Sequence, residues 1–526
     1  MTNNPAERGI GAALAAVLPQ DGLRWWQKPH LVYLNFCLWS LFLFSSANGY
    51  DGSMMNGLQA LPQWQEALHH PKGAWLGFLN AVQSLGAFCC YPVIAWSNNR
   101  FGRKKTVAVG YFWLVIGTAL QTAAQNPTMF VLGRLCIGGA SSFWSASVPL
   151  LMTETAYPTH RANLTALYNC GWYVGSLLAA WVTYGTRNYD SYWAWRIPSV
   201  CQICIPVAAL PGFLMAKESP RWLISKGRHE EARAFLIKYH GGGDQVSPLA
   251  DFEFNEISSA IELEDRIKAE TSYRQMFATK GNRHRSFITI TLGVFAQWNG
   301  VGIASYYLAP VLLTVGITSV TDQTMISGFL QVWNLILAVS AAFLVDRLGR
   351  RPLFLVSCFG MLACYVFISA LSGSFANTGN AATGIAVIPF LFLYYGFYDI
   401  AFTPLLVSYT CEIWNYTYRA RGLAMNQWST ALAVFFNIFV NPIALGAIQW
   451  KYYIVYVAIL VVITTVVWFF YPETRGHSLE EMAHVFDGSA AAVPDAFRIK
   501  EEAQSRASVD HDVQNKSGAM AHVEQK

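Results

Sequence analysis

Long apolar stretches alternate with short polar segments along almost the whole chain. Each stretch is bounded by charged residues, glycine or proline. The stretches lie at 31–50, 74–97, 107–124, 128–150, 165–185 and 195–216, and again at 286–313, 324–345, 352–372, 384–410, 423–446 and 451–471. A helix needs about 20 predominantly apolar residues to cross a bilayer, so each stretch can supply one span. The pattern predicts an all-α membrane protein with twelve transmembrane helices.

The stretches form two sets of six, separated by a segment rich in charge. Such a segment is typical of a solvated linker with short helices. Residues 488–526 are polar and are expected to be disordered. We therefore predict five parts: a cytoplasmic N-terminal tail at 1–30, a six-helix half at 31–216, a cytoplasmic linker at 217–285, a second half at 286–471, and a largely disordered cytoplasmic tail at 472–526.

Composition supports a membrane protein and excludes several classes. Hydrophobic residues make up 54% of the chain and charged residues 13%, whereas soluble proteins average about 25% charged residues. Disorder, collagen and an ordinary soluble enzyme are excluded, and the sequence contains no enzyme motif. The net charge of +5 comes from basic clusters between apolar stretches. We therefore expect the bilayer, and not nucleic acid, as a partner.

The ten cysteines lie in or beside apolar runs, where we expect reduced, buried side chains. Cys201 and Cys204 have a CxxC spacing, but no second Cys or His pair accompanies them. We therefore predict no metal site.

The distribution of Lys and Arg predicts the orientation in the membrane. One alternating set of loops carries Arg100, Arg103, Lys104, Lys105, Arg161, Arg347, Arg350, Arg351, Arg419 and Arg421, whereas the other carries Lys72, Arg187 and Lys451. Cytoplasmic loops are enriched in basic residues. Both termini and the linker are therefore predicted to be cytoplasmic.

The two halves also repeat in sequence. The repeated motifs are RFGRKK from Arg100 and RLGRR from Arg347, Glu154 with Arg161 and Glu412 with Arg419, and ESPR from Glu218 and ETRG from Glu473. The offsets are 247, 258 and 255 residues. An internal repeat of half the chain, with binding between the halves, is typical of rocking secondary transporters.

Several motifs together resemble the sugar porter family of the major facilitator superfamily over most of residues 31–487. They are GYD at 49–51, GRLCIGG at 133–139, WRIPSVCQ at 195–202, ESPRWL at 218–223, QWNG at 297–300, SYY at 305–307, DRLGRR at 346–351 and PETRG at 472–476. The stretches at 165–181 and 412–422 look most like the fungal branch of lactose permeases and cellodextrin transporters. The resemblance implies the major facilitator fold with two pseudo-symmetric halves.

Asp51 ends the first predicted span and Arg134 lies within the fourth. An ion inside the membrane costs roughly 2.5–3.5 kcal/mol on insertion scales, which makes it a functional candidate. The resemblance implies that the two form the proton-coupling pair. Burial favours a neutral carboxyl and a nearby guanidinium favours a charged one, so movement of the arginine would switch protonation. The alternative is that Asp51 caps a helix end.

A sugar presents many hydroxyls and needs amide side chains and aromatic faces around it. The resemblance implies sugar contacts by Asn169, Gln297, Tyr306, Asn334, Gln427 and Trp428. The alternative for each is hydrogen bonding between helices.

Three positions depart from the common monosaccharide pattern. Ala296, Gly302 and Val407 stand where many members have larger side chains. This suggests a wider cavity and a larger substrate, unless an aromatic residue such as Phe402 fills the space.

The cytoplasmic motifs predict a charge network that bridges helix ends and favours the outward-open state. Its members are Arg103, Glu154, Arg161, Glu218, Asp346, Arg350, Glu412, Arg419 and Glu473. The alternative is that the basic residues only set the topology.

Together these features predict a sugar:proton symporter of the plasma membrane, which takes up a mono- or disaccharide by alternating access and functions as a monomer. A lactose- or cellobiose-like substrate is favoured. The proton is the coupling ion, and no cofactor is expected. The alternatives are a sugar sensor that does not transport, and a facilitative hexose uniporter.

Overall fold

A computed structural model describes residues 12–19, 23–270, 272–475, 482 and 485–486. In this part of the chain every regular element is helical. The predicted disordered tail lies almost wholly outside the described residues.

The first half contains five long helices and one split helix. Their bounds are α2 Pro29–Ala60, α4 Gly73–Phe101, α5 Arg103–Thr122, α6 Pro127–Thr155 and α7 Pro158–Thr186, with the split helix formed by α8 Trp193–Cys201 and α9 Cys204–Met215. Short helices lie before and between them: α1 Ala12–Val17, η2 Trp25–Gln27 and α3 Pro62–Ala67.

The segment between the halves forms α10 Pro220–Ser225, α11 His229–Tyr239, α12 Pro248–Glu270 and η3 Tyr273–Phe277. The second half then follows with α13 Lys280–Trp298, α14 Val301–Tyr306, α15 Leu308–Thr314, α16 Val320–Leu348, α17 Arg350–Thr378, α18 Ala381–Ile385, α19 Val387–Ile413, α20 Tyr416–Ile448, η4 Gln449–Lys451 and α21 Tyr452–Phe470. The domain boundaries named above stay predictions.

Three predicted continuous spans are wrong in detail, because the helix is interrupted in each. The stretch 286–313 breaks into α13, α14 and α15. Gly300 follows Asn299 with a φ of +106°, a conformation that suits glycine. The stretches 195–216 and 384–410 break between α8 and α9 and between α18 and α19.

Eight helical stretches are long and apolar enough to cross a membrane, and the last of them covers both α20 and α21. Three of the predicted spans are not among these eight stretches, namely α5, α7 and the broken α13–α15. Basic or polar residues at their ends explain this for α5 and α13, which begin with Arg-Lys-Lys and with Lys-Gly-Asn-Arg-His-Arg. The three are nevertheless helical, so each of the twelve predicted spans corresponds to a helix or an interrupted helix in the described part of the chain, six in each half.

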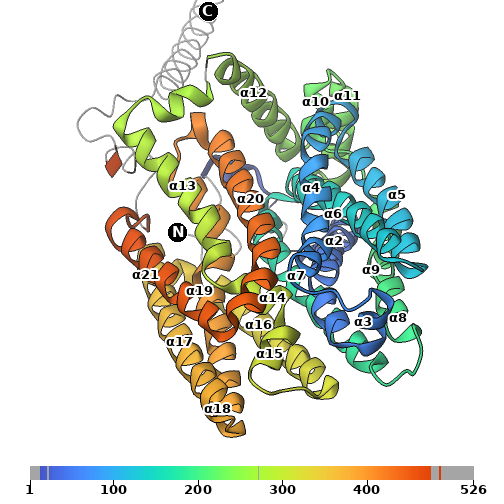
Figure 1. Ribbon diagram of the computed structural model, residues 1–526. Coiled ribbons are helices and arrows are strands. Elements are labelled where there is room, and N and C mark those ends of the chain that lie inside the picture. The colour runs from blue at the N-terminus through green and yellow to red at the C-terminus, as the bar shows by residue number, and fades with distance from the viewer. Residues whose placement is uncertain (1–11, 20–22, 271, 476–481, 483–484, 487–526) are drawn as a thin grey trace, which may run out of the picture.

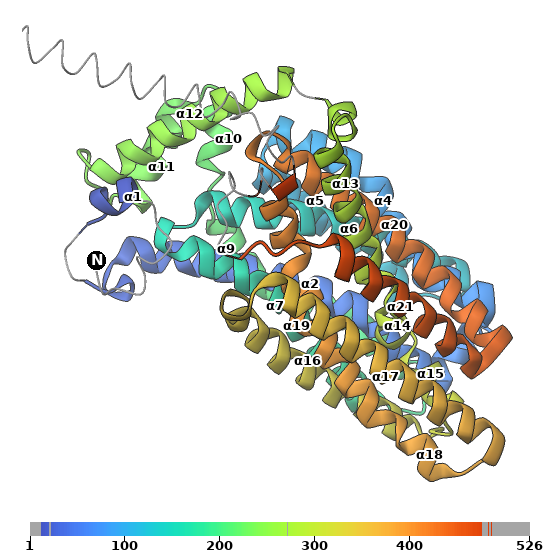
Figure 2. The ribbon, with the colours of Figure 1, turned by 90° about the vertical axis from the view of Figure 1, so that its left-hand side faces the viewer.

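The same helix contacts recur in both halves. The contact of α5 with α6 in the first half corresponds to that of α17 with α19 in the second. The contacts of α2 with α7 and α9 correspond to those of α13 with α20 and α21. The halves meet along α4 with α20 and α7 with α16. Each half also has its own apolar core. Figures 1 and 2 show the two halves side by side, with α10–α12 covering one end of the bundle.

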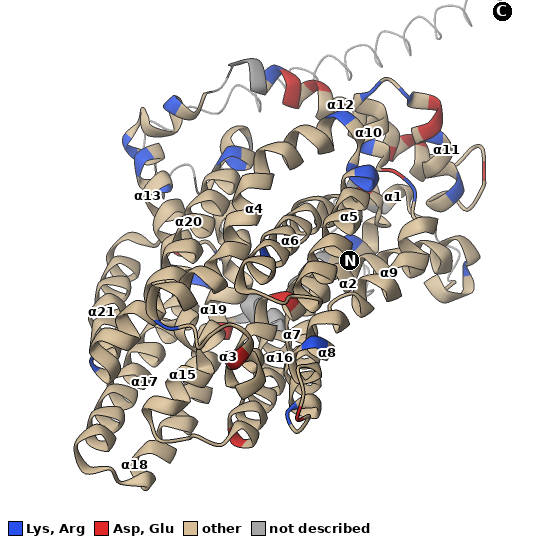
Figure 3. Cartoon of the chain, turned by 45° about the vertical axis from the view of Figure 1, so that its right-hand side comes forward, with Lys and Arg blue, Asp and Glu red and all other residues tan. Residues whose placement is uncertain are grey.

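Charge is concentrated at that end of the bundle. Lys and Arg gather near α10–α13, while the long helices consist almost entirely of uncharged residues (Figure 3). The few charged residues inside the bundle are therefore candidates for a functional role.

Candidate functional site

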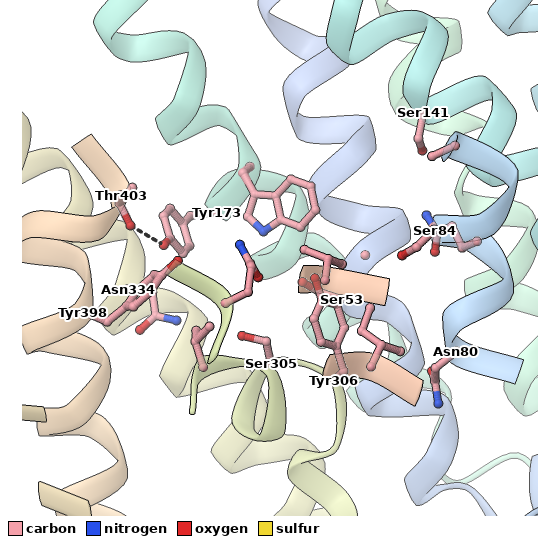
Figure 4. A pocket seen from close by; sticks show the side chains of 18 of the residues that line it. Ser53, Asn80, Ser84, Ser141, Tyr173, Ser305, Tyr306, Asn334, Tyr398 and Thr403 are labelled. Carbon is pink, nitrogen blue, oxygen red and sulfur yellow. Dashed lines mark hydrogen bonds between the residues drawn. The ribbon is translucent and has the colours of Figure 1, made fainter. Parts of the chain in front are cut away.

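A cavity of about 450 Å³ lies between the two halves. Helices α2, α4, α6 and α7 of the first half and α13, α14, α16, α19 and α20 of the second contribute to its wall. Most of its polar lining consists of amides and hydroxyls: Ser53, Asn80, Gln83, Ser84, Ser141, Tyr173, Gln297, Ser305, Tyr306, Gln331, Asn334, Tyr395, Tyr398 and Thr403. Figure 4 shows side chains from both halves around the cavity, among them Ser53, Asn80 and Tyr173 of the first half and Ser305, Asn334 and Tyr398 of the second.

Four of the predicted site residues line this cavity: Arg134, Gln297, Tyr306 and Asn334. Gln297 lies just before the break between α13 and α14, and Tyr306 ends α14 just before α15 begins. Discontinuous helices are typical of transporter binding sites, because side chains and freed backbone groups face the cavity. Asn334 is 1% exposed, and its Oδ1 atom has no hydrogen-bond partner in the described part of the chain. It therefore keeps an acceptor for a bound molecule.

Two predicted contacts, Gln427 and Trp428, do not line the cavity. Trp428 is 57% exposed and packs edge-on against Phe88 of α4, with 5.3 Å between ring centroids. The residues of α20 that do line it are Val434 and Ile438. Val434 lies about 9 Å farther along the helix than Trp428. In this conformation Gln427 and Trp428 therefore lie outside the cavity.

Asn169 lies in α7, but its side chain is outside the described part of the chain. The helix contributes two other residues, Trp172 and Tyr173, to the cavity wall.

Asp51 and Arg134 are both buried in the first half, with 1% and 2% exposure. The hydroxyl of Ser141 lies 3.5 Å from Oδ2 of Asp51, and Oδ1 has no partner among the described residues. Nε and Nη1 of Arg134 also have no partner there. No ion pair within 4.0 Å joins Asp51 to Arg134 in this conformation, although the two charges interact at longer range.

Several hydrogen bonds join described residues of different halves. They lie at the middle of the bundle and at the end opposite α10–α12. At that end, Asn56 of α2 donates to the carbonyl of Ser305 and accepts from the N–H of Leu308 at 3.1 Å. Gln59 donates to the carbonyl of Tyr306 at 2.8 Å. These bonds hold α2 against α14 and α15 and close the cavity at that end.

The predicted charge network forms two equivalent clusters, one in each half. In the first, Nη2 of Arg103 lies 3.0 Å from Oε1 of Glu154. Glu218 accepts from the N–H of Arg103 at 3.0 Å and of Lys104 at 3.1 Å. These contacts join α5, α6 and the segment after α9 within the half.

The second cluster repeats this geometry. Nη2 of Arg350 lies 2.9 Å from Oε1 of Glu412. Glu473 accepts from the N–H of Arg350 at 2.9 Å and of Arg351 at 3.0 Å. The contacts lie within the second half and join α17, α19 and the segment after α21.

The structure describes the side chains of two of the other three predicted members, Arg161 and Arg419. Arg161 lies 3.8 Å from Glu253 of α12, so it contacts the linker. Arg419 lies in the first turns of α20. The side chain of Asp346 is outside the described part of the chain.

The two equivalent glutamates differ in their surroundings. Burial raises the pKa of the Glu218 carboxyl, although backbone N–H groups oppose the shift. Burial acts on Glu473 as well, but its four backbone N–H donors outweigh it and lower the pKa. The Glu473 carboxylate is therefore the better stabilised of the two.

The expectation of extra space at Ala296, Gly302 and Val407 does not hold at these positions, because none of them lines the cavity. A Cβ on Gly302 would lie 1.7 Å from Oδ1 of Asn437, which occupies that space. Phe402 does line the cavity.

Sequence reasoning missed several residues of the site, namely Asn80, Gln83, Ser84, Trp172, Tyr173, Gln331, Tyr398 and, behind the wall, Asp399. Asp399 could have been found by the argument applied to Asp51, since it lies within the apolar stretch 384–410. The hydroxyl and amide residues carry no such signal, because membrane helices often use them for packing.

The family described as "Sugar (and other) transporter" matches residues 37–486. The "MFS-type transporter oryC" of Aspergillus oryzae is 28% identical over 501 residues, which is 90% of this chain and 92% of that protein. The "High-affinity glucose transporter 1" of Candida albicans is 25% identical, over 84% of this chain and 83% of that protein.

Among solved structures, the inward-open xylose transporter XylE from E. coli has a similar fold. Its TM-score is 0.71 at 22% identity, over 86% of this chain and 100% of XylE.

Proposed function

Since this chain belongs to the sugar transporter family of the major facilitator superfamily, and is thus a multi-pass membrane transporter and not an enzyme, we propose that it is a sugar:proton symporter. It takes up a mono- or disaccharide through the plasma membrane by alternating access. The proposal rests chiefly on one observation: a cavity between the halves that combines amide and aromatic side chains with Arg134 in its wall and Asp51 close by.

The cavity suits a neutral, hydroxyl-rich molecule. The amides of Gln297, Gln331 and Asn334 both donate and accept hydrogen bonds, as sugar hydroxyls do. Aromatic side chains such as Trp172 and Tyr306 offer faces for the C–H surface of a sugar ring. A cavity of about 450 Å³ lies in the range of about 300–1,000 Å³ typical of small-molecule sites. That size accommodates either a hexose or a disaccharide of the lactose or cellobiose type.

The separation of Asp51 and Arg134 supports a coupling of proton binding to sugar transport. Each has unpaired polar atoms in a site with little exposure to solvent. A proton on Asp51 removes a buried negative charge, and a closer approach of Arg134 would compensate that charge instead. Proton binding and the position of α6 relative to α2 are thereby linked.

Lys and Arg gather at the end with α10–α12 (Figure 3), and because cytoplasmic loops are enriched in basic residues, we infer that this end faces the cytoplasm. Both termini are then cytoplasmic. The bonds from Asn56 and Gln59 close the opposite, extracellular end. The conformation described here is therefore inward-facing, and the charge clusters lie at the cytoplasmic ends of their halves, where they stabilise each half as a unit.

The test is uptake of glucose, xylose, lactose and cellobiose by proteoliposomes at two external pH values. One pH unit supplies about 1.4 kcal/mol and 100 mV about 2.3 kcal/mol. Together they support accumulation of roughly 500-fold. We expect sugar entry to be accompanied by alkalinisation outside the vesicles.

Asp51→Asn should abolish accumulation against a gradient and leave sugar exchange intact, because the amide mimics a permanently protonated carboxyl. Unchanged accumulation in this variant would remove Asp51 from the coupling mechanism. Sugar entry without proton movement in the parent protein would identify a uniporter, and sugar binding without entry would identify a sensor.

A further inference from the structure

Asp399 is a second carboxylate inside the bundle, and the function proposed above does not use it. It lies in α19, 0% exposed, behind the wall of the cavity. No ion pair of the described residues involves it, and its Oδ2 atom has no hydrogen-bond partner there. A fully buried carboxyl group without a cation needs another reason to be present.

Its other oxygen binds two hydroxyl groups. The Tyr173 hydroxyl donates to Oδ1 at 2.5 Å, and the Thr403 hydroxyl donates to the same atom at 2.8 Å. Thr403 lies one turn along the same helix, whereas Tyr173 comes from α7 of the first half. Both hydroxyl residues line the cavity, and Figure 4 shows them together at one side of it, near Tyr398 and Asn334.

This arrangement decides which way the hydroxyl protons point. A hydroxyl group has one proton to donate and lone pairs with which to accept. The two hydroxyls lie 3.3 Å from each other, but both have a shorter contact with the Asp399 carboxylate behind the wall, so Tyr173 and Thr403 each give their proton to Asp399. Their lone pairs are then the only hydrogen-bonding groups that they offer to a molecule in the cavity.

We propose that Asp399 is a positioning residue that makes this wall of the cavity a hydrogen-bond acceptor, so that the site selects a substrate with a donating hydroxyl there. Asp399 does not touch the substrate and acts through Tyr173 and Thr403. The proposal rests on the function proposed above, because it assumes that a sugar occupies the cavity.

Substitution of single sugar hydroxyls tests this directly. A hydroxyl donates and accepts, fluorine accepts weakly and cannot donate, and hydrogen does neither. At a subsite made of acceptors, a deoxyfluoro sugar must bind more weakly than the deoxy sugar, since fluorine faces oxygen lone pairs. At a subsite with a donor, the order reverses.

The experiment uses the full-length protein in proteoliposomes. Monodeoxy and deoxyfluoro derivatives of D-glucose and cellobiose compete with the parent sugar for uptake. For one ring position we expect the deoxyfluoro sugar to compete more weakly than the deoxy sugar, and both to lose roughly 5- to 100-fold against the hydroxyl. In Asp399→Asn the amide can donate to Tyr173 or Thr403, which frees a hydroxyl proton for the cavity. The order at that position should therefore reverse.

Two more variants keep the test independent of folding. Tyr173→Phe should reduce the discrimination at the same ring position, and combining it with Asp399→Asn should give less than the sum of the two effects, because both changes act on the Tyr173 hydroxyl. Ser408→Ala is the matched control, since Ser408 lies on α19 and bonds to the carbonyl of Pro404, away from the cavity. The competition by the deoxyfluoro sugar and by the deoxy sugar is compared on the same variant. A smaller fraction of active protein therefore does not change their ratio. Variants that no longer transport are measured by calorimetric binding.

Retention of the parent order at every ring position in Asp399→Asn would overturn the proposal and leave only a structural contact between the halves. Sugar transport by the parent protein would still stand in that case. If the parent protein neither transports nor binds these sugars, the proposed function fails, and this proposal fails with it.

Discussion

Asn334 and Gln297 show how single polar side chains define the cavity. Both come from apolar helices of the second half, and both face the space between the halves. A buried amide in a membrane helix is costly unless it is hydrogen-bonded. Because Oδ1 of Asn334 has no partner among the described residues, it is available to accept a hydrogen bond from a bound molecule.

We therefore predict that Asn334→Ala and Gln297→Ala each raise the KM for sugar by about 5- to 30-fold, since each removes a hydrogen bond to the substrate. Initial uptake rates over a range of sugar concentrations measure this. Gln63→Ala is the control, because Gln63 bonds to Tyr189 at the far end of the first half. An unchanged KM in both cavity variants would place the sugar elsewhere.

At the scale of the helix, two glycines set the starts of α5 and α17. Gly102 has φ +99° and Gly349 has φ +92°. A Cβ would lie 2.4 Å from Oε2 of Glu218 in the first case and 3.0 Å from Oε2 of Glu473 in the second. The glutamates can reach the first N–H groups of these helices only because the glycines have no side chain.

We predict that Gly102→Ala lowers the thermal stability of the protein more than Gly349→Ala does. The backbone conformation alone costs roughly 1–3 kcal/mol for a non-glycine residue. The shorter Cβ contact adds to this cost at Gly102. Gly379→Ala serves as the comparison and should cost least, because Gly379 has a positive φ of +64° with no atom within 4 Å of an added Cβ. Thermal unfolding in detergent gives the order, and equal losses at Gly102 and Gly379 would show that the contact with Glu218 has no effect.

The glutamates themselves predict a pH dependence. The pKa of Glu473 is lowered, so its charged form stabilises the folded protein above the usual pKa of 4.5, and this is lost as the pH falls through the lowered value. The pKa of Glu218 is raised, so its ionisation opposes folding as the pH rises. At pH 7, Glu473→Gln should cost roughly 1–2 kcal/mol and Glu218→Gln less. The difference should shrink as the pH approaches 4. Melting curves between pH 4 and 8 would show this, and a larger loss for Glu218→Gln would contradict it.

At the scale of the whole molecule, the two halves share a cavity, and the hydrogen bonds between described residues of different halves lie at its middle and at one end. The charge clusters join helices within each half, whereas the bonds of Asn56 and Gln59 cross between the halves. A rocking motion can therefore break the hydrogen bonds between the halves and preserve the charge clusters within each half.

We predict that Asn56→Ala combined with Gln59→Ala shifts the protein toward the outward-facing state. Three hydrogen bonds to the other half are lost. At about 1 kcal/mol each, the equilibrium changes by up to roughly 100-fold. Spin labels on the exposed Glu66 of α3 and Ala382 of α18, which lie at the same end of different halves, report the distance in a variant without cysteines. Gln65→Ala, which loses a bond within one half, is the control, and an unchanged distance distribution in the double variant would exclude this lock.

The sequence by itself determined the membrane fold. Apolar stretches and the repeated motifs act locally, since each helix satisfies its own backbone in lipid and each motif sits at a helix end. Arg103, Glu154, Arg350 and Glu412 were predicted as members of one charge network, and the structure pairs Arg103 with Glu154 and Arg350 with Glu412 at equivalent positions. Gln297, Asn334, Tyr306 and Arg134 were likewise named from sequence, and all four line the cavity.

Only the tertiary structure decided which polar residues face the same space. Tyr173 and Thr403 are separated by 230 residues and meet because α7 packs beside α19. Trp428 and Val434 lie on one helix, yet only Val434 lines the cavity. The sequence pattern cannot resolve this, because a polar residue in a membrane helix looks the same whether it binds a neighbouring helix or a substrate. The difference depends on how two helices distant in sequence are positioned against each other.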